Sequence, residues 1–254
     1  RADDRVEMDR GGRRVEVRVA NRRGGRGGPA NLEIRVPAGS TLSVTAGSAP
    51  ITVSGITGSV EAVGQSGPVT VQANARRVEV VAQSGPVTIE GQVETLDVTA
   101  MSGPVRVSAN VRQIATIEAL SGPVDLLGSV GETHVNAVSG NVRVANASGG
   151  RVEIEAVSGN VTLNGTRLRG YVQSVSGNLV VAGSVGGALT LESRNDLLAS
   201  MTDEVGHLVL QDNYYQTQQI ELAATRPVYL LDGQQNLMRW LEHIGLLKRA
   251  IEFL

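Results

Sequence analysis

The residues best suited to chemistry are carboxylates and a histidine that recur at similar intervals along the chain. One series consists of Glu79, Asp97, Thr116, His134, Glu153 and Tyr171, and a second series beside it consists of Glu118, Asn136 and Glu155. Neighbouring carboxylates could serve as general acid and base in the cleavage of a glycosidic bond, and His134 between carboxylates could bind a metal ion. Exposed Glu, His and Thr are also ordinary surface residues, and the uniform intervals leave no room for long loops around a catalytic groove. We therefore favour a structural interpretation of both series.

Other signatures of catalysis are missing from the sequence. No Gly-x-Ser-x-Gly occurs in a hydrolase setting, no His-Glu-x-x-His occurs, and Lys248, the only lysine, belongs to no phosphate loop. Cysteine is absent, which excludes disulfides, thiolate metal sites and a cysteine nucleophile. We expect a protein that is not an enzyme, with no catalytic residues, no metal site and no cofactor.

The elements that must position these residues follow from an internal repeat. The phrase Ser-Gly-Pro or Ser-Gly-Asn returns every 18 or 19 residues, with its serine at Ser66, Ser84, Ser102, Ser121, Ser139, Ser158 and Ser176. Within one period the apolar residues alternate, as in Val69 and Val71 and then Val78 and Val80, which is the pattern of a strand with one buried face. The next periods place Val87 and Val105 in the same column as Val69. The sequence thus predicts an all-β fold, a single-stranded parallel β-helix (β-solenoid) of about nine coils over residues 31–210.

The glycine of each phrase marks the corner of a coil, where a positive φ would exclude residues that carry Cβ. These structural turn residues are Gly67, Gly85, Gly103, Gly122, Gly140, Gly159 and Gly177. The residue that follows is proline in the first four phrases and asparagine in the last three, and both suit the start of a strand after a turn. We expect Asn141, Asn160 and Asn178 to pair along the rod.

Charge and hydropathy limit the partners. The net charge is −2, which gives no reason to expect nucleic acid, and no apolar stretch is long enough to span a bilayer, so any membrane contact would be peripheral. Residues 1–30 form an Arg- and Gly-rich N-terminal arm with a first strand. Its arginines could touch phosphate or acidic polysaccharide, although no aromatic residue accompanies them, and a solvated arm is the favoured interpretation.

The repeat stops near residue 211, and residues 211–254 form a linker and a C-terminal element. Residues 233–253 are mostly good helix formers, with Asp232 as the N-cap, and predict an amphipathic α-helix. The helix either caps the last coil or docks onto a partner protein. The candidate docking residues are Tyr214, Tyr215, Leu237, Trp240, Leu241, Ile244, Leu247 and Ile251.

The turn phrases, preceded by the segment Leu32-Glu33-Ile34-Arg35-Val36-Pro37-Ala38-Gly39, resemble the bacterial adhesin-type repeat family, whose function is uncharacterised. The likeness covers roughly residues 12–210. It implies a β-solenoid outside the cytoplasm, in the periplasm, at the cell surface or secreted, that presents surface to a protein or a glycan. Alternatives are an accessory subunit of a larger envelope complex docked through the C-terminal helix, and, less favoured, a polysaccharide-active enzyme.

Overall fold

The computed structural model describes residues 33–194, apart from residue 149 and the side chains of Asn146 and Ser148. Outside this range it describes the backbone of residues 5–11, 14–20, 197–203, 207–212, 219–223, 228–231 and 237–241.

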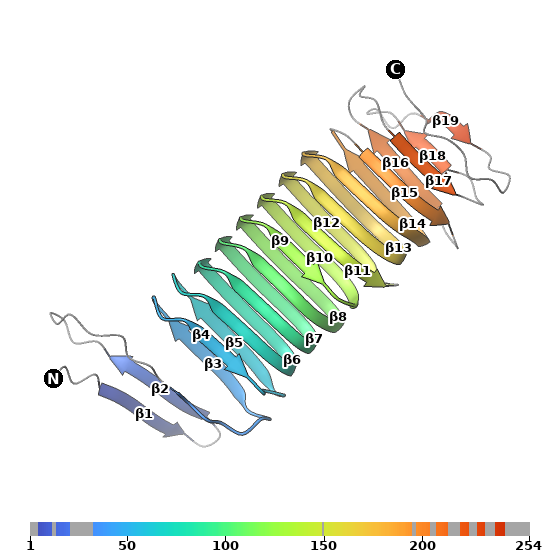
Figure 1. Ribbon diagram of the computed structural model, residues 1–254. Helices are drawn as coiled ribbons and strands as arrows, with labels where there is room; N and C mark the ends of the chain where they lie inside the picture. The colour runs from blue at the N-terminus through green and yellow to red at the C-terminus, as the bar shows by residue number, and fades with distance from the viewer. Residues whose placement is uncertain are drawn as a thin grey trace.

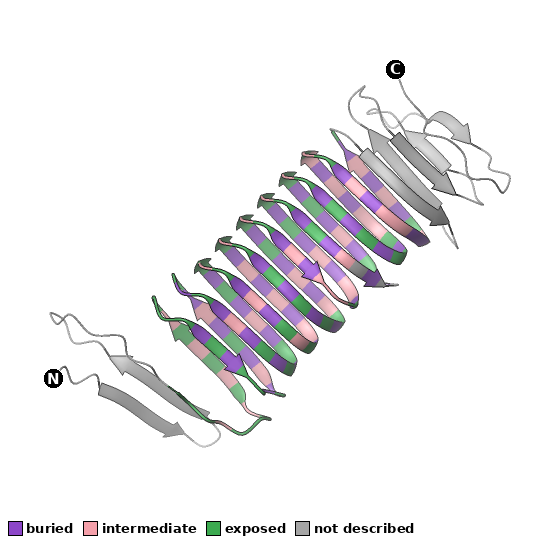
Figure 2. Ribbon diagram, viewed as in Figure 1, coloured by how far each residue is buried: buried purple, intermediate pink, exposed green. Residues whose placement is uncertain are grey.

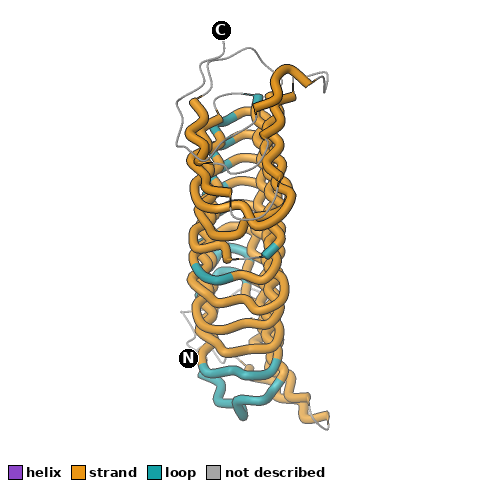
Figure 3. Tube along the Cα trace, turned by 90° about the vertical axis from the view of Figure 1, so that its right-hand side faces the viewer, coloured by secondary structure: helices purple, strands orange, loops and turns teal. Residues whose placement is uncertain are grey.

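The described residues form a β-solenoid in which parallel strands are stacked coil upon coil (Figure 1). The strands of the rod, in chain order, are β3 (Thr41–Ala46), β4 (Ile51–Ser54), β5 (Ser59–Gly64), β6 (Val69–Ser84), β7 (Val87–Ser102), β8 (Val105–Ser121), β9 (Val124–Leu127), β10 (Val130–Ser139), β11 (Val142–Ser148), β12 (Arg151–Ser158), β13 (Val161–Ser176), β14 (Leu179–Ser193), β15 (Leu197–Asp203), β16 (His207–Asp212), β17 (Gln219–Ala223) and β18 (Val228–Leu231). Within the described residues no helix is present, and the tube in Figure 3 shows the coils as a narrow column. The predicted all-β parallel solenoid is confirmed.

Each coil contributes a strand segment to two sides of the rod, here named face I and face II. Face I follows the Ser-Gly turn, as at residues 69–75, and face II precedes the next Ser-Gly turn, as at residues 77–84. The Ser-Gly turn is the glycine corner, and the bend from face I to face II is the second corner. Strands such as β6 run through the second corner without interruption.

Equivalent residues of successive coils lie directly opposite one another. Val69 pairs with Val87, and Val87 pairs with Val105, in parallel register. All three valines are at most 1% exposed, so the prediction that they line the interior of adjacent coils is confirmed. Where a coil has 19 residues, as between Val105 and Val124, both faces stay in register because the extra residue is absorbed at the second corner, where the pairing shifts.

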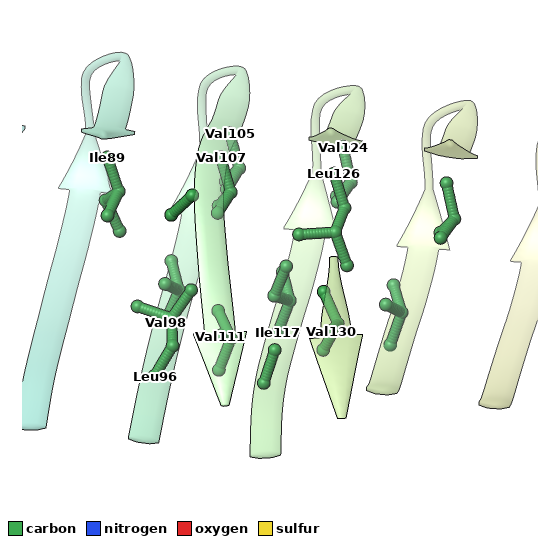
Figure 4. Close-up of a cluster of buried hydrophobic side chains, with 14 of the residues drawn as sticks. Ile89, Leu96, Val98, Val105, Val107, Val111, Ile117, Val124, Leu126 and Val130 are labelled. Atoms are coloured by element: carbon green, nitrogen blue, oxygen red, sulfur yellow. The ribbon is translucent and has the colours of Figure 1, made fainter. Parts of the chain in front are cut away.

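The core is a thin aliphatic layer between the two faces. Buried residues alternate with more exposed ones along most of the strands from β3 to β14 (Figure 2), as a pleated strand with one inward side requires. Ile89, Leu96, Ile117 and Leu126 are fully buried and project from neighbouring coils into one continuous cluster (Figure 4). Burial of each such side chain stabilises the fold by about 1.5–3 kcal/mol. One coil could not shield these residues from water, so stability depends on stacking.

The glycine corner needs glycine for a broader reason than the predicted one. Positive φ occurs at Gly103, Gly122, Gly140 and Gly159, as predicted, but Gly67, Gly85 and Gly177 do not have it. At all seven positions, however, an added Cβ would lie less than 3.0 Å from a backbone carbonyl oxygen of the coil below. The glycines thus form a column in which each coil rests directly on the backbone of the preceding one.

The asparagines beside this column also stack, although not through paired amides. The Asn160 backbone N–H donates to Asn141 Oδ1 at 3.1 Å, and the Asn178 backbone N–H donates to Asn160 Oδ1 at 2.9 Å. The side chains of Asn141 and Asn160 therefore each satisfy a backbone donor of the next coil.

Further strands lie on either side of residues 33–194. The N-terminal arm contains an antiparallel hairpin of β1 (Arg5–Gly11) and β2 (Arg14–Ala20), which is a separate sheet. Parallel pairing also continues past residue 210, the expected end of the solenoid, because β17 pairs with β15 and β18 pairs with β16.

The structure also differs from the predicted C-terminal helix at Leu237–Leu241, which form strand β19, antiparallel to β18. The physical reason is that β18 is the last parallel strand described and its outer edge carries a row of backbone N–H and C=O groups. Strand β19 pairs with these groups and satisfies them. The remainder of the predicted helix lies outside the described residues.

Candidate functional site

The outward surface of face II carries four columns of side chains between the two corners. One coil contributes Arg151, Glu153, Glu155 and Val157 in that order, from the second corner to the glycine corner. Equivalent residues of adjacent coils are in register with these four. The two predicted series of polar residues are therefore the two central columns.

His134 lies near the middle of the first polar column, between Thr116 and Glu153 on adjacent coils. Its Nε2 is 2.9 Å from Glu153 Oε2 and 3.9 Å from Glu132 Oε1. Arg151 Nη2 lies 4.0 Å from the same oxygen of Glu153. Because these side chains keep much of their exposure to solvent, each of these contacts stabilises the rod by at most about 1 kcal/mol.

The same column continues as an exposed ion-pair ladder at lower residue numbers. Arg77 Nη2 lies 3.1 Å from Glu79 Oε2 and 3.8 Å from Asp97 Oδ2 of the next coil. A similar pair occurs on face I, where Arg106 Nη2 is 3.6 Å from Asp125 Oδ2. Glu79 and Asp97 face each other on adjacent coils, and Arg77 lies close to both carboxylates. Arg106 and Asp125 face each other directly with opposite charges.

The polar columns do not assemble a metal centre in the part of the chain that the structure describes. No three His, Asp or Glu side chains in it are grouped so as to hold a metal ion. His134 has two carboxylates nearby, but the next member of its column on one side is Thr116. The arrangement suits a surface ladder better than a coordination sphere.

Tyr171 is the last residue of the first predicted series and lies at a partly buried position. Its hydroxyl donates a 2.7 Å hydrogen bond to Glu192 Oε2 from the following coil. Burial, the hydrogen bond and the negative charges of Glu192 and Glu155 all raise the pKa of the Tyr171 phenol. Tyr171 thus stays neutral and acts as a hydrogen-bond donor that joins two coils.

The Tyr171 phenol is expected to ionise at higher pH than an ordinary tyrosine, whose pKa is about 10. Because the folded state holds this proton more tightly than the unfolded state, the contribution to stability is complete below about pH 10. It is lost as the pH rises from there through the raised pKa. The measurement is an alkaline titration followed by tyrosinate absorbance, with the curve of Tyr171→Phe subtracted from that of the native protein. The difference should show that Tyr171 ionises at a higher pH than an ordinary tyrosine.

Glu192→Gln is the matched control for that titration, since it removes the negative charge and keeps a side chain able to accept the hydrogen bond. It should shift the ionisation of Tyr171 toward the ordinary value. A difference titration centred near pH 10 in the native protein would contradict the assignment.

An apolar ridge occupies the fourth column, beside the glycine corner. It consists of Met101, Leu120, Val138 and Val157, which are 46–50% exposed. These residues lie on successive coils, because the residues that flank them pair directly, for example Ala119 with Ala137. Exposed apolar groups scattered singly are common, but a straight row at one position of a repeat is a marker of protein contact.

The ridge was missed by sequence reasoning, although a signal existed. Each ridge residue follows an inward-facing alanine and precedes the serine of the turn phrase, so it breaks the strict alternation of apolar and polar residues. The equivalent positions in earlier coils are Gln65 and Gln83, which keep the alternation.

The docking residues predicted in the C-terminal segment are only partly described. Leu237, Trp240 and Leu241 belong to β19, whereas Tyr214, Tyr215, Ile244, Leu247 and Ile251 lie outside the described residues. Within the described part of the chain there is also no helix with the length and apolar character needed to cross a membrane.

The fold and surface define a single-chain parallel β-solenoid with a regular, loop-free exterior over residues 69–127. The Toastrack DUF4097 family model matches residues 3–197, and the chain belongs to this family. This agrees with the expected uncharacterised β-solenoid family, while the adhesin-type assignment stays a prediction.

Comparison with curated proteins gave short matches only. The chain is 49% identical over 63 residues to the NAD-specific glutamate dehydrogenase of Pseudomonas aeruginosa and 46% identical over 63 residues to that of Halomonas elongata. Each match covers 25% of this chain and 4% of the relative. No solved structure matches the chain. The chain thus spans only a small fraction of the length of these relatives.

Proposed function

We propose that the chain is a non-catalytic scaffold of the bacterial envelope, whose rod presents surface to a partner protein. The observation that carries this proposal is the apolar ridge of Met101, Leu120, Val138 and Val157. Its members have roughly half of their surface in water, where apolar area is unfavourable. A partner that covered the ridge would remove these side chains from water, and their burial would stabilise the complex.

The rigid lattice beneath the ridge supports the same role. The ridge side chains are spaced by one coil, about 4.8 Å, along a backbone fixed by continuous ladders on both sides. A partner therefore meets a preorganised row of contacts and loses little conformational freedom of the scaffold on binding. The polar columns beside the ridge provide the hydrated rim that surrounds a typical contact.

A location outside the cytoplasm is part of the proposal and is supported by the resemblance to adhesin-type repeats. The absence of a grouped set of acid, base and nucleophile on the described faces favours a binding role over catalysis. Membership in a larger envelope complex is a narrower form of the proposal, in which the ridge and the C-terminal segment would both contact other subunits.

Polar substitution of the ridge is expected to abolish partner binding while the rod stays folded. The variant Met101→Gln, Leu120→Gln, Val138→Thr and Val157→Thr should weaken the contact at least about tenfold, because a row of central apolar contacts is lost. The measurement is co-purification from the native host with identification of the retained protein, followed by titration of the two purified proteins.

Thr70→Gln, Thr88→Gln and Thr162→Gln on the outward side of face I provide the control variant. A protein retained by the native chain and the control, but lost with the ridge variant, supports the proposal. Equal retention by the ridge variant contradicts it. Self-association through the ridge, seen by sedimentation of the purified chain, would contradict a separate partner.

A further inference from the structure

A hollow lies at the second corner, on the opposite edge of face II from the ridge. It has a volume of about 810 Å³ and is lined by residues that include Arg112, Gln113, Glu132, Arg151, Arg169 and Tyr171. Gly131 and Gly170 also line it. A Cβ at either glycine would lie less than 3.0 Å from a backbone carbonyl oxygen of the coil below, so the chain excludes larger residues there. We call this hollow the arginine groove.

The arginine groove carries excess positive charge on a chain whose net charge is −2. Its lining includes three arginines and one carboxylate, that of Glu132. Arg151 approaches Glu153 only at 4.0 Å, and the guanidinium of Arg112 donates to the neutral Gln92 amide at 3.4 Å. No ion pair of Arg169 is found within the described residues. The Arg112 and Arg169 guanidinium groups are consequently available to an anionic ligand, and that of Arg151 is held only by its long contact with Glu153. All three can bind an anion through paired N–H donors.

The arginines are spread along the rod rather than gathered around one point. Arg151 and Arg169 are opposite each other on adjacent coils, about 4.8 Å apart along the axis. Arg112 belongs to the coil below that of Glu132, two coils from Arg151. The positive charge therefore extends over about 15 Å of the rod, which suits an extended polymer better than a single small anion.

Other side chains of the groove indicate a polymer that carries hydroxyl groups as well as anions. The Glu132 carboxylate accepts hydrogen bonds and would repel a ligand of uniform negative charge, whereas the Gln113 amide both donates and accepts. Nucleic acid is disfavoured because single strands bind to aromatic stacking platforms, and Tyr171 is the only aromatic residue within residues 33–194.

We propose that the arginine groove binds an acidic polysaccharide, with Arg112, Arg151 and Arg169 contacting its carboxylate or sulfate groups. The inference rests on the proposed role as a surface-presenting scaffold and names a ligand class for it. The groove and the ridge are separate surfaces, so the polysaccharide proposal and the partner-protein proposal can be contradicted independently. The ridge variant should bind polysaccharide as the native chain does.

The test is affinity electrophoresis of the full chain in gels that contain polygalacturonate, dextran sulfate or neutral dextran. The native protein should be retarded by polygalacturonate if carboxylates are recognised, or by dextran sulfate if sulfates are, and not by neutral dextran. The variant Arg112→Gln, Arg151→Gln and Arg169→Gln should bind at least about tenfold more weakly. Arg35→Gln, Arg106→Gln and Arg143→Gln remove the same charge outside the groove and should leave binding within about twofold of the native value.

Circular dichroism and thermal unfolding should confirm that both arginine variants remain folded. If the groove variant is unstable, the lysine series Arg112→Lys, Arg151→Lys and Arg169→Lys replaces it, and binding should still fall because paired donors are lost. Absence of binding by the native protein, equal binding by the groove and control variants, or stronger binding of oligothymidylate than of either acidic polysaccharide would each overturn the proposal.

Discussion

Gly140→Ala is expected to lower the free energy of unfolding by about 3 kcal/mol or more. Gly140 has φ of +144°, a conformation that L side chains rarely adopt, and such strain costs about 1–3 kcal/mol. In addition, the new Cβ would overlap the carbonyl oxygen of Gly122 on the coil below. Because each coil is stabilised mainly by its neighbours, displacement of this contact weakens the stacking on both sides. Urea unfolding followed by circular dichroism measures the loss.

Gly39→Ala is the matched control for this experiment. Gly39 lies in a turn before β3, its φ is outside the left-handed range, and an added Cβ would meet no atom within 4 Å. The same chemical change there should alter the free energy of unfolding by less than about 1 kcal/mol. If the two variants lost equal stability, the close stacking of the glycine column would not be the cause.

Ile117→Ala is expected to lower the free energy of unfolding by about 2–4 kcal/mol. Ile117 is fully buried between Val98 and Val135 of the adjacent coils, and the interior is too thin to fill the space that the substitution leaves. The lost transfer free energy and the cavity therefore both count. Thermal and urea unfolding of the full chain test this expectation.

Leu120→Ala, on the same strand β8, is the control that tests whether burial of the side chain causes the loss of stability, rather than truncation of an apolar side chain as such. Leu120 is 49% exposed, and its truncation should cost less than about 1 kcal/mol in the isolated protein. Comparable losses for Ile117→Ala and Leu120→Ala would show that the inward and outward sides of β8 are wrongly assigned.

The rod could be predicted from sequence because two independent periods agree in it. Alternation of period 2 assigns inward residues such as Val69 and Val71, and the Ser-Gly phrase fixes which coil follows which. The C-terminal region has neither signal. From Leu237 onward, helical periodicity in the sequence competed with the unpaired backbone of β18, and tertiary pairing prevailed at Leu237–Leu241.

The surface was less predictable than the interior. The polar columns follow directly from the register, so the proximity of His134 to Glu153 was foreseeable. The arginine groove was not, because it lies at the second corner, where coils differ in length and no common phrase marks equivalent residues. Arg112 and Arg169 become neighbours of one hollow only after the shifts in pairing at that corner are known.

Because successive coils share one register, coils can be added or removed without a change of fold, and the length of the rod can vary. Val69, Val87 and Val105 begin the face I strands of three successive coils, each offset by 18 residues. Excision of 87–104 would join Pro86 to Val105, which occupies the same place in its own coil as Val87, and every inward side chain would remain inward. Duplication of one coil would extend the rod by about 4.8 Å with the same local contacts. In evolution, such rods can therefore become longer or shorter by duplication or deletion of the gene segment that encodes one coil, while the fold stays the same.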